Sequence, residues 1–206
     1  MIFFHFFYDL DLFSYVDIDF SKDKFWFGLP RLIVFLFLIA MGLSMPLVHK
    51  SKIKWPKFLK RFLQISLYAI AISITTYFMF PKTWVYFGTL HCIALCSLMA
   101  LPFLKIPKIS GLIGFIMLSM HALFNIGIPW FMLPHISMDY IPLFPWIGVV
   151  LIGFFLNNIG FHTLRLPSNK MLSGLEKLGK HSLLIYIIHQ PILFGGISLF
   201  HKLTSN

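Results

Sequence analysis

Charged side chains are scarce in this sequence: only 12% of its 206 residues are Asp, Glu, Lys or Arg. A soluble domain carries about 25%, so the chain is too poor in charge to cover an ordinary water-soluble fold. Hydrophobic residues make up 58% of the chain and include 25 phenylalanines, and the mean hydropathy is +0.84. A lipid bilayer supplies the apolar surroundings that such a chain needs. We therefore predict a membrane protein in which residues 1–206 form a single transmembrane domain.

Cysteine is also rare, and the excess of positive charge is dispersed. Cys92 and Cys96 lie four residues apart in one apolar run, where we expect two buried helix residues and no disulfide. The net charge of +10 comes from basic residues in short loops that form no continuous face. This distribution argues against a nucleic-acid-binding protein. The sequence also lacks the tight ligand spacings of metal-binding motifs, so no metal site is predicted.

Six apolar runs approach the roughly 20 residues that a membrane-spanning helix needs, and proline or glycine stands near their ends. The N-terminal MIFFHFFY is equally apolar, but eight helical residues rise only about 12 Å. We therefore predict an all-α fold, a polytopic transmembrane helix bundle with six full helices and an incomplete N-terminal one. The predicted spans are 29–48, 62–80, 85–104, 109–127, 142–162 and 182–200.

The loop charges alternate along the chain and indicate an orientation. Most of the basic residues fall in three alternate segments, 49–61, 103–110 and 163–181, whereas five of the seven acidic residues crowd into the loop of residues 9–23. By the positive-inside rule the lysine-rich loops are cytoplasmic and the aspartate-rich loop lies outside. The expected location is the cell (inner, cytoplasmic) membrane, crossed several times.

Polar side chains inside hydrocarbon are costly, so each is a functional candidate, although hydrogen bonds between helices explain many of them equally well. The orientation places His5, Asp9, Arg31, His91, His121 and Asn125 in the outer half of the membrane. An imidazole base, a carboxylate that orients it and a cation for a developing oxyanion suit acid–base chemistry. The predicted catalytic residues are His5, His91, Asp9 and Arg31. The predicted substrate-binding residues are His121, Asn125, Asp139, His189 and Gln190.

Five stretches carry a family resemblance: FHFFYDL (4–10), RLIVFLFLIAMGLS (31–44), YFGTLHCIAL (86–95), DYIPLFPWIGVVLIG (139–153) and LGKHSLLIYIIHQPIL (178–193). In this order the chain resembles the heparan-alpha-glucosaminide N-acetyltransferase catalytic-domain family, in its bacterial form, within the wider group of multi-helix membrane acyltransferases. The resemblance covers nearly the whole chain.

The resemblance implies an acyltransferase that moves an acetyl group from cytoplasmic acetyl-CoA to a sugar or glycan acceptor at the outer side. It implies an intramembrane histidine as the key residue, for which His5 is favoured over His91. Arg31, Asp139 and the HQP element at 189–191 match positions typical of the family. Family members usually begin with an Arg-x-x-Asp-x-x-Arg-Gly stretch that is absent here. We expect either a start assigned too late or a truncated copy.

Two alternatives stay open from the sequence. Intramembrane His, Asp and Arg residues also serve proton-coupled transporters of small solutes, and a truncated paralogue would be a non-catalytic partner. The expected partners are membrane lipids and a sugar or glycan acceptor, with no nucleic acid. A homo-oligomer is compatible with the sequence.

Overall fold

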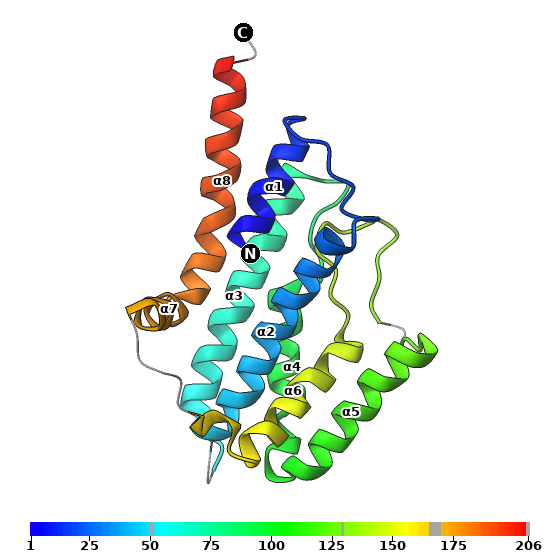
Figure 1. The fold of residues 1–206 in the computed structure, drawn as a ribbon, viewed down its shortest axis with the longest axis vertical. Coiled ribbons are helices and arrows are strands. Elements are labelled where there is room, and N and C mark those ends of the chain that lie inside the picture. Colours follow the sequence, from blue (N-terminus) through cyan, green and yellow to red (C-terminus); the bar gives the residue numbers. More distant parts are fainter. Residues whose placement is uncertain (50–51, 129, 165–169, 205–206) are drawn as a thin grey trace. The chain divides into compact units, whose positions relative to one another are not determined.

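The computed structural model describes residues 1–49, 52–128, 130–164 and 170–204. These residues form eight α-helices and two short 3-10 helices and contain no β-strand, which confirms the all-α prediction. In chain order (Figure 1) the α-helices are α1 (Ile2–Leu12), α2 (Lys24–Val48), α3 (Trp55–Met79), α4 (Thr89–Met99), α5 (Pro107–Phe124), α6 (Leu143–Asn158), α7 (Lys170–Lys180) and α8 (Ser182–Thr204).

The helices form two compact units. The terminal unit comprises Met1–Ile33 together with α7 and α8, and the central unit comprises Val34–Leu164. Helix α2 therefore begins in the terminal unit and ends in the central one. The single-domain organisation of residues 1–206 stays a prediction.

In the terminal unit, α1 runs beside α8 in the same direction. His5 of α1 lies against His189 of α8, with ring centroids 4.9 Å apart, and Phe13 just beyond α1 meets Phe194 at 5.6 Å. The indole of Trp26, in the first turn of α2, packs on the rings of α1 and comes within 5.2 Å of Phe7. Aromatic packing thus holds the short α1 against both α8 and the start of α2.

Helix α6 is the core of the central unit because its sequence is apolar on every side. Residues Val149–Leu151 are at most 1% exposed. Small residues let neighbouring helices approach α6 closely. A Cβ atom added to Gly153 of α6 would lie 2.7 Å from the Cα atom of Gly42 in α2, and one added to Gly114 of α5 would collide with the carbonyl oxygen of Gly148.

In the part of the chain that the structure describes, four helices, α2, α3, α5 and α8, are long and apolar enough to cross a membrane. One face of α3 shows how the chain meets lipid: Leu67 is 64% exposed and Phe78 is 77% exposed, and Leu63, Ile70 and Ile74 are each more than half exposed. Such a stripe of large apolar side chains is unfavourable in water and suits a bilayer. The chain is a membrane protein.

The helix boundaries differ from the predicted spans for local reasons. Helix α2 begins earlier, at Lys24, because the Asp23 carboxylate accepts the Phe25 N–H at 2.8 Å and caps the helix. Helix α3 also begins earlier, with Pro56 in its first turn. Helices α4 and α6 have only 11 and 16 residues, and α4 is followed by the 3-10 helix Leu101–Lys105.

The sequence predicts a loop over residues 163–181, which are too polar to span a membrane, whereas the structure forms helix α7 there. Of the basic residues used for the predicted orientation, Lys50 and Arg165 lie outside the described residues.

Candidate functional site

Four polar side chains from α1 and α8 meet inside the terminal unit. His5 and Asp9 are four residues apart and share one face of α1. His189 lies against His5, and the Gln190 side-chain amide donates to Asp9 Oδ1 at 2.9 Å. Asp9 is completely buried and His189 is 8% exposed. We call these four residues the histidine pair cluster.

The hydrogen bonds of His189 indicate which ring nitrogen carries a proton. Its Nδ1 atom lies 3.1 Å from the Ile185 carbonyl oxygen and 2.8 Å from that of Tyr186. Carbonyl oxygens only accept, so Nδ1 carries the proton, and in the neutral ring Nε2 carries a lone pair. This Nε2 atom is buried in the interior without a hydrogen-bond partner in the described part of the chain.

Three further buried atoms of the cluster have no hydrogen-bond partner among the described residues: His5 Nδ1, Asp9 Oδ2 and Gln190 Oε1. A buried polar atom that loses its hydrogen bond costs about 1–3 kcal/mol. Folded proteins rarely leave such atoms unpaired, and a ligand, ion or water is the usual explanation where several gather. The cluster therefore has the properties of a binding or reaction site.

The pairing with α8 gives the position of His5 along that helix. His189 is seven residues from the start of α8 and fifteen from its end, or about 10 Å and 22 Å along the helix. His5 is level with His189. The residues that follow α1 reach the end of α8, where the Tyr15 hydroxyl meets His201 and Thr204. The predicted place of His5 in the outer half of the membrane stays a prediction.

His91 belongs to a second, separate arrangement, in the central unit. It stands in the first turn of α4, and its Nδ1 atom accepts the backbone N–H of Gly88 at 3.2 Å. Its Nε2 atom lies 3.2 Å from the Ser73 hydroxyl, which itself donates to the Val85 carbonyl at 2.6 Å. The Ser73 oxygen is thus the acceptor for Nε2–H. Both nitrogens of His91 are engaged in holding α3 and the start of α4 together.

Asp139 contacts the same helix start from the loop between α5 and α6. Its Oδ2 accepts the Thr89 N–H at 2.8 Å, and its Oδ1 accepts the Thr89 hydroxyl at 3.3 Å. A carboxylate at a helix N-terminus is stabilised by the helix dipole. Burial raises the pKa of Asp139, and the two hydrogen bonds from Thr89 act in the opposite direction. The residue fastens the loop between α5 and α6 to the start of α4.

The other predicted residues lie elsewhere. The Arg31 guanidinium donates to the Phe27 carbonyl at 2.6 Å and stacks over the Phe27 ring, so it is engaged within its own helix. His121 Nδ1 lies 3.1 Å from the Ile126 carbonyl oxygen, just past the end of α5. Asn125 ends that helix in the left-handed conformation, with φ of 51°, which asparagine adopts more readily than most residues.

A family model for "Heparan-alpha-glucosaminide N-acetyltransferase, catalytic" matches residues 1–191. The chain belongs to this family. The match includes both α1 and the His189–Gln190 part of α8, so the whole histidine pair cluster lies inside it. Membership, together with the membrane-spanning helices, indicates a membrane acyltransferase-type role. Comparisons with curated proteins and with solved structures found no match.

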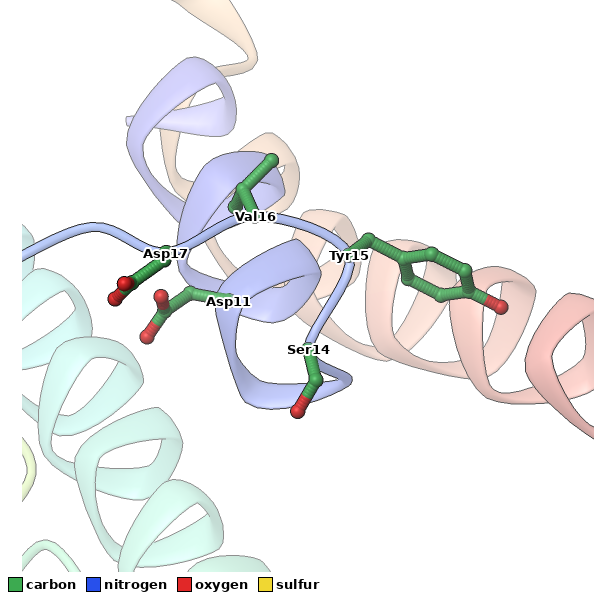
Figure 2. A pocket seen from close by; sticks show the side chains of 5 residues that line it. All are labelled: Asp11, Ser14, Tyr15, Val16 and Asp17. Carbon is green, nitrogen blue, oxygen red and sulfur yellow. The ribbon is translucent and has the colours of Figure 1, made fainter.

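In this member of the acetyltransferase family, a hollow of about 450 Å³ follows α1 and is lined by Asp11, Ser14, Tyr15, Val16 and Asp17. Figure 2 shows the Asp11 and Asp17 carboxylates on one side and the Tyr15 ring extending over α8. The Tyr15 hydroxyl lies 3.2 Å from His201 Nδ1, and Asp11 accepts the Ile18 N–H at 2.9 Å. None of these five lining residues is a histidine, whereas the buried cluster holds two.

Two participants around His91 were missed by the sequence analysis, Ser73 and Thr89. Both are hydroxyl residues in apolar surroundings, where interhelical hydrogen bonds are expected, but neither titrates near neutral pH, and only ionisable and amide groups were singled out. From the sequence, His5 and Asp9 are predicted catalytic residues, and His189 and Gln190 are predicted substrate-binding residues. The four side chains lie in one cluster.

Proposed function

We propose that the protein is a membrane-embedded acetyltransferase that moves an acetyl group from cytoplasmic acetyl-CoA to a sugar or glycan acceptor at the outer side of the membrane. The observation that carries this proposal is the histidine pair cluster, in which four buried polar atoms have no hydrogen-bond partner among the described residues. The family membership of the chain supports the same reaction class, acyl transfer. The cell (inner, cytoplasmic) membrane is the proposed location.

Within this proposal His5 is the general base. As the acceptor nitrogen or oxygen bonds to the acetyl carbonyl carbon, His5 takes the proton that the acceptor loses. The carbon–sulfur bond of the donor breaks, and the proton held by His5 passes to the departing sulfur. Acetyl-CoA, when bound, supplies the acetyl group in activated form as a thioester. Asp9, one turn from His5 on α1 and held by Gln190, is the carboxyl group of the cluster.

His189 is assigned a supporting role beside His5. Its Nδ1–H is committed to two backbone carbonyls, and its Nε2 lone pair is buried. A ring fixed in this way can accept a hydrogen bond from a neighbouring imidazole or from the acceptor, but it cannot donate from Nε2 while neutral. Gln190 Oε1 is a second buried acceptor. Both suit the N–H or O–H groups of a sugar.

The depth of the cluster suits transfer between the two sides. A site about 10 Å from one end of α8 and about 22 Å from the other lies well inside the hydrocarbon. The donor need only insert its thioester end from the cytoplasmic side, while the acceptor approaches from outside. We assign no step of this chemistry to five other predicted residues, whose contacts are local or structural: Arg31, His91, His121, Asn125 and Asp139.

The test is acetyl transfer from radiolabelled acetyl-CoA to glucosamine, used as a probe acceptor, in membranes that contain the full chain. We expect His5→Ala to lower the transfer rate by about 10²–10⁴, the usual contribution of a general base. His162→Ala is the control, because His162 is exposed in the 3-10 helix Phe161–Thr163. Transfer at the unaltered rate in a correctly folded His5→Ala protein would refute the proposal.

A further inference from the structure

Helix α7 has one apolar and one polar side. Leu175 and Leu178 lie three residues apart on one face and are 52% and 58% exposed. Glu176, Lys177 and Lys180 project from the opposite side of the helix. With 11 residues α7 is about 16 Å long, too short to cross the hydrocarbon of a bilayer.

The connection to α8 fixes how α7 is presented. Only His181 separates the two helices; it donates its N–H to the Leu178 carbonyl at 3.1 Å and accepts the Ile185 N–H at 3.0 Å. Figure 1 shows α7 nearly end-on beside the start of the upright α8, so the helices meet at a steep angle. Since α8 is a candidate membrane span, a helix lying across its end runs along the membrane surface.

The charges of α7 indicate that this membrane surface carries anionic headgroups. Glu176 is paired with Lys180 at 2.8 Å, which leaves Lys177 without a carboxylate partner among the described residues. The sequence 170–180 holds three lysines and one acid, and an amphipathic helix with this excess binds best to anionic lipid headgroups.

We propose that α7 is an interfacial anchor that lies in the anionic headgroup layer of the leaflet where α8 begins. Leu175 and Leu178 enter the upper acyl chains, and Lys177 contacts lipid phosphates. The anchor fixes the depth at which α8 starts, and therefore the depth of His189. It does not depend on the reaction assigned to the histidine pair cluster.

The test uses the full chain in vesicles of equal parts phosphatidylcholine and phosphatidylglycerol. An environment-sensitive thiol dye is attached to Leu175→Cys or, as the matched control, to Ser173→Cys on the polar face. Cys92 and Cys96 are fully buried, so the unaltered protein reports background labelling. We expect a blue-shifted emission and quenching by acyl-chain spin-labelled lipid at position 175, and quenching by aqueous iodide at position 173.

The charge is tested separately by Lys177→Glu in the Leu175→Cys background. We expect this change, or vesicles of phosphatidylcholine alone, to reduce the blue shift. Equal quenching of both labels by iodide would overturn the anchor. A blue shift that is unaffected by Lys177→Glu and by lipid charge would overturn the anionic-lipid assignment. A blue shift that grows with the protein-to-lipid ratio would show that a second copy covers this face instead.

Discussion

Replacing His91 separates a structural histidine from a catalytic one. In His91→Ala the buried N–H of Gly88 loses its acceptor, and the Ser73 hydroxyl loses a donor. An orphaned buried donor costs about 1–3 kcal/mol, so we expect the free energy of unfolding to fall by about that amount. His91→Gln should behave differently, because His91 is the third residue of α4, where glutamine commonly reaches back to the N-cap backbone N–H.

The assay is thermal unfolding in a mild detergent, measured beside acetyl transfer in membranes. We expect His91→Gln to restore most of the lost stability and to retain transfer, whereas His91→Ala loses stability first. His162→Ala again serves as the exposed control. Full stability combined with abolished transfer in His91→Gln would refute this reasoning, because glutamine can replace the cap but cannot act as a base.

Two contacts of the central unit give further testable outcomes. Gly153→Ala places a Cβ atom 2.7 Å from the Gly42 Cα atom and should lower the free energy of unfolding by about 1–3 kcal/mol. Gly195→Ala is the control and should not lower it, because the space around Gly195 is open. Equal unfolding temperatures of the two variants would contradict the close helix contact. Asp139→Ala should cost about 1–3 kcal/mol through the unpaired Thr89 N–H. Asp139→Asn should cost less, since its oxygen still accepts that N–H, and equal losses in thermal unfolding would refute the capping role.

Much of the fold was predictable because hydrophobic run length and loop charge are strong local signals in membrane proteins. All six predicted spans contain a helix, and the short N-terminal segment is α1. Helix boundaries were less predictable, since they depend on single capping contacts such as that of Asp23. Helix α7 was not predictable from apolar run length, because a short amphipathic helix has a low mean hydropathy.

The individual residues of the candidate site were predictable from the sequence, but their spatial proximity was not. His5, Asp9, His189 and Gln190 were all singled out, yet only the parallel packing of α1 on α8 brings them together. The register of α1 against α8 was not predictable, because a short helix can pack anywhere along a longer one and the sequence holds no signal for that register. His91 looked equivalent to His5 in sequence; its hydrogen bonds to Gly88 and Ser73 distinguish the two.

The role of the histidine pair cluster is tested most directly by comparing acetyl transfer by His5→Ala and His91→Gln, assayed side by side at matched amounts of folded protein in membranes. We expect the transfer rate of His5→Ala to fall by about 10²–10⁴ and that of His91→Gln to stay close to the rate of the unaltered protein. Retained transfer in His5→Ala together with its loss in His91→Gln would contradict the assignment of acyl-transfer chemistry to the histidine pair cluster.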